Sequence, residues 1–95
     1  MCNFGEVFTT DGRIPPALNL RVLEDDKTFF PLYNLSEVID SELLDAHPEL
    51  EEIFAQLNPR LTNETMLALN AKVDNDGDDP ALVARDWLIE QGLVS

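Results

Sequence analysis

The chain has 95 residues, of which 44% are hydrophobic and 26% charged, an ordinary composition for one soluble globular domain and not for a disordered chain. Nineteen acidic residues against six basic ones give a net charge of −13, which repels phosphate backbones and anionic membrane surfaces. We therefore expect no nucleic-acid partner, and we interpret the acidity as a solvated surface.

The first third of the chain, residues 1–34, alternates extended runs with turn signals. An apolar and β-branched run at residues 7–10 ends at Asp11 and Gly12, a strong turn signal. A second apolar run at residues 20–23 ends in a charged turn. The pattern predicts a strand, a loop, a second strand and a further loop.

Residues 35–40 alternate weakly between apolar and polar side chains, which fits either a short strand or the entry to a helix. Asp40 or Ser41 then caps a short helix that ends at Ala46. Pro48 suits the first turn of the next helix. That helix carries one apolar stripe at i, i+3, i+4 and i+7, formed by Leu50, Ile53, Phe54 and Leu57.

Two further helices complete the chain. Thr62 is the predicted N-cap of the first of them. Asp79 followed by Pro80 predicts the start of the second, and Gly92 is expected just past its end. The whole pattern predicts an α/β fold with two or three short strands plus about four helices.

The sequence contains few of the residues and motifs that catalytic and metal sites require. His47 is the only histidine and Cys2 the only cysteine, which leaves a zinc site or a Cys–His pair without ligands. Asp74, Asp76 and Asp78 lack the EF-hand spacing, and no nucleophile elbow or glycine-rich phosphate loop is present. We expect a protein that is not an enzyme, with no cofactor and no metal.

Two segments carry a family resemblance: FTTDGRI at residues 8–14 and LRVLEDDKTFFPLYN at residues 20–34. They resemble the last third of the substrate-binding proteins of osmoprotectant ABC importers, the glycine betaine/carnitine/choline family. The likeness continues in LDAHPEL (44–50), LTNETM (61–66) and DPALVARDWL (79–88).

The resemblance implies the C-terminal portion of a type II periplasmic-binding-protein fold, and by the same resemblance residues 35–40 are expected to form a third short strand. Residues 1–95 would then form a single partial domain. Within it, residues 1–34 would supply a strand, hinge, strand and cleft segment, and residues 35–95 a C-terminal helical segment.

The resemblance also implies a function without catalysis: binding glycine betaine, choline or carnitine and delivering it to an ABC permease. In this family an aromatic cage holds the quaternary ammonium, which has no N–H to donate. The matching positions are Phe8, where a tyrosine is usual, and Tyr33. Beside them, Thr9, Thr10 and Asp11 either line the cleft or form a strand end with an Asx-type turn.

The binding energy that this chain supplies is small. Two cation–π contacts contribute about 1–4 kcal/mol, whereas a 1 mM dissociation constant needs about 4.1 kcal/mol. We expect the isolated chain to bind weakly or not at all. The alternative is a stand-alone acidic protein-interaction module derived from the same fold, in which uncovered apolar surface promotes self-association or partner binding. A hydrolase is the third and weakest hypothesis.

Members of this family work outside the cytoplasm, in the periplasm or anchored to the outer side of a membrane, and carry a signal peptide. No apolar leader precedes the first predicted strand, so we expect no signal peptide in these residues. For the same reason we interpret Cys2 as a free thiol rather than an acylated cysteine.

Overall fold

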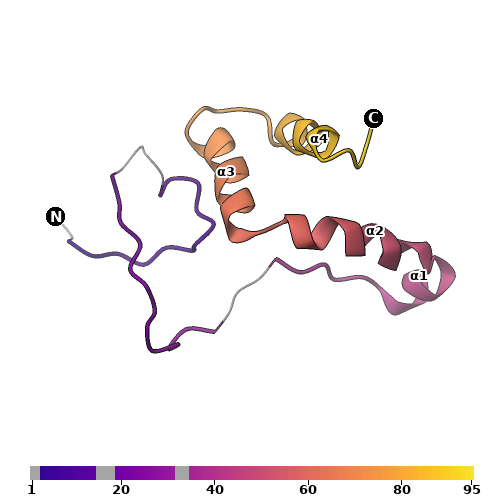
Figure 1. Ribbon diagram of the computed structural model, residues 1–95, viewed down its shortest axis with the longest axis horizontal. Coiled ribbons are helices and arrows are strands. Elements are labelled where there is room, and N and C mark those ends of the chain that lie inside the picture. Colours follow the sequence, from indigo (N-terminus) through magenta and orange to yellow (C-terminus); the bar gives the residue numbers. More distant parts are fainter. Residues whose placement is uncertain (1–2, 15–18, 32–34) are drawn as a thin grey trace. The chain divides into compact units, whose positions relative to one another are not determined.

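The structure, a computed structural model, describes residues 3–14, 19–31 and 35–95 (Figure 1). The described residues form four α-helices and one 3₁₀ turn. The chain divides into two compact units. The first unit comprises Met1–Glu24 and Asn63–Ser95, and the second comprises Asp25–Thr62.

The predicted α/β class is wrong for the part of the chain that the structure describes, because none of the three expected strands forms. A strand needs a second strand to receive its backbone hydrogen bonds. The backbone near residues 7–10 instead bonds within turns, such as Asp11 N–H to the Phe8 carbonyl at 3.0 Å. Residues 20–23 and 35–40 likewise run without ladder partners, and Val22 is 52% exposed rather than half-buried against a sheet.

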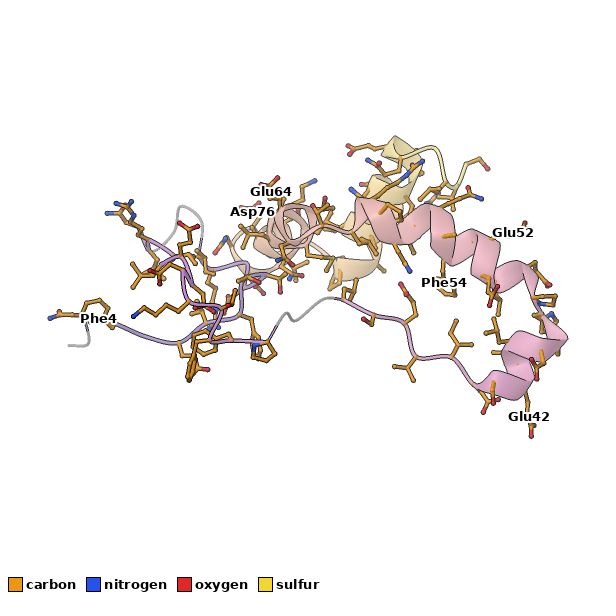
Figure 2. All side chains as sticks on the ribbon, turned by 60° about the horizontal axis from the view of Figure 1, so that its bottom comes forward. Phe4, Glu42, Glu52, Phe54, Glu64 and Asp76 are labelled. Atoms are coloured by element: carbon orange, nitrogen blue, oxygen red, sulfur yellow. The ribbon has the colours of Figure 1, made fainter. Side chains whose placement is uncertain are left out.

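The second unit begins its helical part with α1 (Ser41–Ala46). The Asp40 carboxylate caps this helix by accepting the backbone N–H groups of Glu42 at 2.8 Å and Leu43 at 3.3 Å. This confirms the predicted start and settles the cap on Asp40 rather than Ser41. Glu42 itself is one of the exposed acidic side chains labelled in Figure 2.

Helix α2 (Glu49–Leu57) follows Pro48 and continues into the 3₁₀ turn η1 (Asn58–Arg60). The helical end at Asn58 is held by its side chain, whose Nδ2 donates to Glu37 Oε2 at 3.0 Å. The predicted apolar stripe is only half-buried, since Phe54 is partly covered and Ile53 is 54% exposed.

The first unit contains α3 (Asn63–Asp74) and α4 (Pro80–Glu90), which contact each other. Helix α3 begins directly after Thr62, as predicted. The Asp79 carboxylate caps α4 by accepting the N–H groups of Ala81 at 2.9 Å and Leu82 at 3.2 Å. Both predicted helix starts are therefore confirmed.

Helix α4 ends as the sequence predicts, at a glycine in the left-handed region. Gly92 has φ +69°, and its N–H bonds the Ile89 carbonyl at 2.9 Å. Leu93 N–H reaches the Leu88 carbonyl at 3.0 Å, completing a Schellman motif. The buried apolar side chains among the described residues, Ile14 and Val83, both belong to this unit.

Candidate ligand-binding site

The candidate site is built on the loop of residues 8–14, which folds into two successive tight turns. Asp11 N–H bonds the Phe8 carbonyl at 3.0 Å, and Ile14 N–H bonds the Asp11 carbonyl at 3.1 Å. Ile14, only 7% exposed, anchors the end of the loop. The loop is thus compact although it contains no strand.

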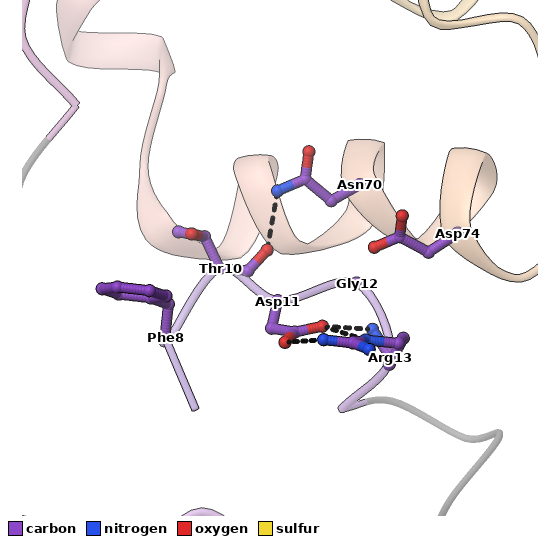
Figure 3. Close-up of a pocket in the computed structure, with 7 residues that line it drawn as sticks. All are labelled: Phe8, Thr10, Asp11, Gly12, Arg13, Asn70 and Asp74. Carbon is purple, nitrogen blue, oxygen red and sulfur yellow. Dashed lines mark hydrogen bonds and ion pairs between the residues drawn. The ribbon is translucent and has the colours of Figure 1, made fainter. Parts of the chain in front are cut away.

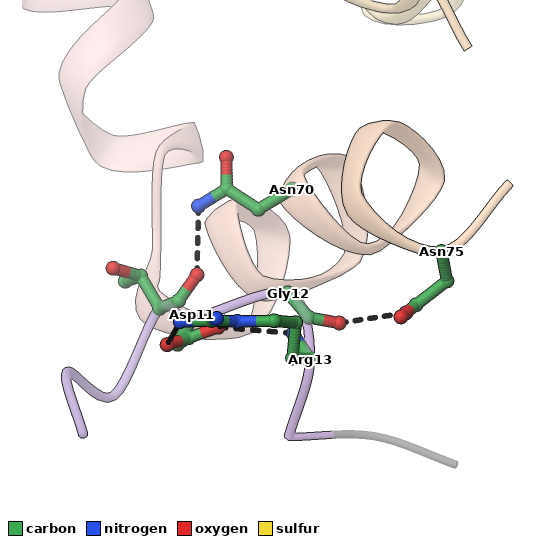
Figure 4. Close-up of polar contacts among 6 residues, drawn as sticks. Asp11, Gly12, Arg13, Asn70 and Asn75 are labelled. Carbon is green, nitrogen blue, oxygen red and sulfur yellow. Dashed lines mark hydrogen bonds and ion pairs between the residues drawn. The ribbon is translucent and has the colours of Figure 1, made fainter. Parts of the chain in front are cut away.

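Asp11 and Arg13 form an ion pair at the centre of this loop (Figure 4). Arg13 Nε donates to Asp11 Oδ1 at 3.0 Å, Nη2 donates to Oδ2 at 2.9 Å, and the Arg13 backbone N–H reaches Oδ1 at 3.1 Å. The last bond confirms the predicted Asx-type turn. These side-chain and backbone bonds from Arg13 lower the pKa of Asp11 to about 2. The same side-chain bonds raise the pKa of Arg13.

Two amide side chains hold the loop, that of Asn70 on α3 and that of Asn75 in the turn directly after α3 (Figure 4). Asn70 Nδ2 donates to the Thr10 carbonyl and Asn75 Nδ2 to the Gly12 carbonyl, each at 2.7 Å. Gly12 is buried, and a Cβ added to it would lie 2.5 Å from the Asn70 carbonyl oxygen and 2.6 Å from Ala71 N. The loop therefore lies directly on the helix backbone, where only a residue without a side chain fits.

An open, shallow pocket of about 400 Å³ lies along the loop and α3 (Figure 3). Its lining combines one aromatic ring, three ionisable groups and polar or small residues: Phe8, Thr10, Asp11, Gly12, Arg13, Asn70 and Asp74. The charge of Asp11 is matched by Arg13, whereas Asp74, exposed at the end of α3, adds a further negative charge. The pocket lining thus carries net negative charge beside an aromatic face.

Three of the five residues proposed from the sequence, Phe8, Thr10 and Asp11, line this pocket. Thr9 is exposed and is not part of the lining. Tyr33 lies outside the described residues.

Sequence reasoning missed four lining residues, two from the loop, Gly12 and Arg13, and two from α3, Asn70 and Asp74. Asn70 lies in the middle of that helix, where asparagine is a poor helix former because its amide competes for backbone hydrogen bonds. A half-buried asparagine at such a position is a signal that its amide has a distant partner. In the sequence, Asp74 belongs to an acidic stretch that was compared with the EF-hand spacing, and Gly12 belongs to a turn signal. Neither pattern points to a pocket.

The part of the chain that the structure describes lacks two other features. In the described ranges, His, Cys, Asp and Glu side chains form no group of three or more that would hold a metal ion. The described helices also include none with the length and apolar character needed to cross a bilayer.

Residues 1–90 match the family model described as the substrate binding domain of the ABC-type glycine betaine transport system. The chain is 46% identical over 86 residues to the glycine-betaine-binding protein of Pseudomonas aeruginosa, covering 90% of this chain. It is 41% identical over 81 residues to the carnitine transport binding protein OpuCC of Listeria monocytogenes, covering 85% of this chain. A third similar protein is the ergothioneine transport permease/ergothioneine binding protein EgtU of Helicobacter pylori, 42% identical over 88 residues and 93% of this chain.

The chain spans only a part of each relative's length: 27% of the P. aeruginosa protein, 26% of the L. monocytogenes protein and 16% of the H. pylori protein. The match nevertheless extends over nearly all of the chain itself. The chain therefore belongs to the family of substrate-binding domains of ABC-type glycine betaine transport systems.

Proposed function

We propose that this chain contributes to binding a quaternary-ammonium solute, namely glycine betaine, choline or carnitine, in the substrate-binding component of an ABC importer. Phe8 and Tyr33 supply aromatic faces to the cage, and Thr9, Thr10 and Asp11 lie beside it. The observation that carries the proposal is the pocket in which the Phe8 ring and the Asp74 carboxylate are both part of the lining.

The chemistry of the pocket suits such a cation. A quaternary ammonium cannot donate a hydrogen bond, so π faces and carboxylates are the groups that attract it. Phe8 is 72% exposed and offers the face, while Asp74 supplies negative charge that Arg13 does not pair at hydrogen-bond distance. The Asp11–Arg13 pair is close to neutral as a unit and shapes the loop rather than attracting the ligand.

Delivery of the solute to an ABC permease, on the outer side of the membrane, is part of the same proposal. The names of the relatives support it: two are called binding proteins for glycine betaine or carnitine, and the H. pylori protein is called both a permease and a binding protein. On this proposal the chain carries out no reaction on the solute.

The test uses a chimera in which this chain replaces the matching segment of the P. aeruginosa glycine-betaine-binding protein, which supplies the remaining length. Isothermal titration with choline is compared with titration of its neutral isostere, 3,3-dimethyl-1-butanol. Phe8→Ala is expected to weaken choline binding by about 2- to 30-fold, the equivalent of one cation–π contact, and Tyr33→Ala by a similar factor. The neutral isostere is expected to bind weakly to every form.

Phe4→Ala is the matched control, because Phe4 is 83% exposed, lies in the same segment and is not part of the pocket lining. It is expected to leave the affinity unchanged. Equal affinities for the Phe8 and Phe4 variants, or equal binding of choline and the neutral isostere, would refute the cage.

A second candidate function is a stand-alone acidic interaction module, and exposed apolar side chains of the second unit favour it. Phe29 is 81% exposed, Phe30 60% and Ile53 54%. The deciding measurement is the mass of the native protein in its source cells, detected with an antibody raised against these residues. A band at the chain's own 10.7 kDa favours the module, whereas a band at roughly three times this mass or larger, as the length of the relatives requires, favours the transporter component.

A further inference from the structure

We propose that Asn70 and Asn75 are positioning residues that hold the ligand-facing loop, residues 8–14, in the geometry that binds the cation. The inference rests on the proposed function, because it assumes that this loop carries the binding residues. It adds a part of the site that acts through the loop: an amide clamp, defined as Asn70 on α3 and Asn75 in the turn directly after α3.

The clamp holds the loop on both sides of Asp11. Asn70 bonds the carbonyl of the residue before Asp11, and Asn75 bonds the carbonyl of the residue after it, each at 2.7 Å. That distance is at the short end of the range for N–H···O hydrogen bonds. Both bonds are partly buried, so water competes less for these carbonyls than at an open surface.

Gly12 makes the clamp possible. The missing Cβ lets the loop approach the α3 backbone until no layer of side chains separates the two. At that separation the short asparagine side chain is long enough to reach a carbonyl of the loop. Two hydrogen bonds and one steric contact thus fix three consecutive loop residues, Thr10, Asp11 and Gly12, to the helix.

The position of the Phe8 ring follows from this attachment. The Asp11 N–H bonds the Phe8 carbonyl at 3.0 Å, so fixing Asp11 fixes the backbone that carries the ring. Because the ring is 72% exposed, packing around it constrains it less than it would a buried ring. We therefore expect a looser loop to place Phe8 in the binding geometry for a smaller fraction of the time, which weakens the apparent affinity by that fraction.

The experiment uses the same chimera as the test of the proposed function, with two variants in this chain, Asn70→Ala and Asn75→Ala, and a matched control, Asn58→Ala. The control removes the same side-chain amide, which donates at 3.0 Å to Glu37 in the second unit. Alanine is a better helix former than asparagine, so Asn70→Ala does not weaken α3 itself. Circular dichroism checks that the helical content is retained.

Two readouts are taken from the same samples by ¹⁵N NMR. The first is the backbone order parameter of Asp11 and Gly12, expected to fall from about 0.85 to below about 0.6 when either clamp asparagine is removed. The second is the dissociation constant of choline, followed at the Phe8 and Thr10 amides with 3,3-dimethyl-1-butanol as the uncharged reference. It is expected to rise about 2- to 10-fold in each clamp variant, the effect of losing one hydrogen bond. Asn58→Ala should change neither readout.

The two proposals fail in different ways. Unchanged order parameters in both clamp variants would overturn the positioning role, whatever choline does. Lower order with an unchanged choline affinity, or equal weakening in Asn58→Ala, would also overturn it and leave the proposed function intact. If the unsubstituted chimera gives the same response to choline and to the uncharged reference, or no response to choline, the proposed function fails, and the role in ligand binding fails with it.

Discussion

Replacing Gly12 by alanine is the most direct test of how the loop lies on α3. The new Cβ would lie 2.5 Å from the Asn70 carbonyl oxygen and 2.6 Å from Ala71 N, both backbone atoms in the middle of a helix. Contacts under 3.0 Å essentially do not occur, and the helix backbone cannot turn aside as a flexible side chain would. The loop must therefore move outward, which lengthens or breaks the two hydrogen bonds of the amide clamp.

The magnitude follows from those bonds. Each contributes about 0.5–1.5 kcal/mol, so losing both lowers the free energy of unfolding of the first unit by about 1–3 kcal/mol. Overpacking of a filled site falls in the same range. With a urea m-value of about 1 kcal/mol/M for a small unit, the unfolding midpoint should fall by about 1–3 M.

Trp87 provides the assay, because it is the only tryptophan and lies half-buried on α4 within the first unit. Urea unfolding is followed by its fluorescence for the unsubstituted chain, Gly12→Ala and Gly5→Ala. Gly5 is the matched control, since a Cβ there meets nothing within 4 Å. Both variants restrict the unfolded chain equally, so their difference isolates the contact with α3. A difference below about 0.5 kcal/mol, the usual size of neutral surface substitutions, would refute the close approach of loop and helix.

Two other predictions concern carboxylates of the first unit. The folded state holds the pKa of Asp11 at about 2, below its ordinary 3.8, so this group contributes stability that is present above about pH 4 and lost as the pH falls towards 2. A ¹³C carboxyl titration should give the low value, and Arg13→Gln should raise it towards 3.8; an unchanged value would contradict the pairing. Asp79→Ala removes the α4 cap and should lower the free energy of unfolding by about 1 kcal/mol, while Asp78→Ala, the control one residue earlier, should not.

The helices could be predicted from the sequence because their signals are local. Asp40 and Asp79 cap helices through bonds to N–H groups two and three residues ahead. Gly92 ends α4 through bonds made within the last turn. Both partners of each such contact lie within a few residues of each other, so the prediction depends on no distant part of the chain.

The absence of the expected strands could not be predicted in the same way. Alternation of apolar and polar residues describes a single segment, whereas a strand also depends on a second segment that pairs with it. Residues 7–10 have the composition of a strand, but a ladder needs hydrogen-bond partners from another segment. The carbonyls in and beside this run bond instead within the turn, at Phe8, and to α3, at Thr10. The turn predicted at Asp11 and Gly12 is present, but it begins earlier, at Phe8, inside the run expected to be a strand.

The residues of the candidate site also differ in whether they could be predicted from local sequence. Phe8, Thr10 and Asp11 were named from a family resemblance carried by a short continuous segment, and they line one pocket. Asn70 and Asn75 contact that segment across 60 and 63 residues of chain, a separation over which no spacing rule operates. A chemical signal exists for Asn70 alone: an asparagine inside an otherwise regular helix is expected to have a partner that compensates for its poor helix propensity.

The net charge of −13 should attract the proposed ligands to different extents. Choline carries one positive charge, whereas glycine betaine is a zwitterion without net charge, so only choline is attracted by the long-range field of the chain. Salt screens that field, with a Debye length of about 30 Å at 0.01 M and about 8 Å at 0.15 M. The affinity of the chimera for choline should therefore fall between these ionic strengths, and its affinity for glycine betaine should change much less.

Asp74→Asn tests whether this preference is local to the pocket, because it removes the carboxylate of the lining that has no arginine at hydrogen-bond distance. Asp76→Asn is its control, since Asp76 carries the same charge two residues further on and is not part of the lining. If Asp74 contributes, its variant loses more choline affinity than the control and shows a weaker salt dependence. Equal losses in the two variants would assign the attraction to the overall charge, and equal salt dependence of choline and glycine betaine would exclude an electrostatic contribution to the choice of ligand.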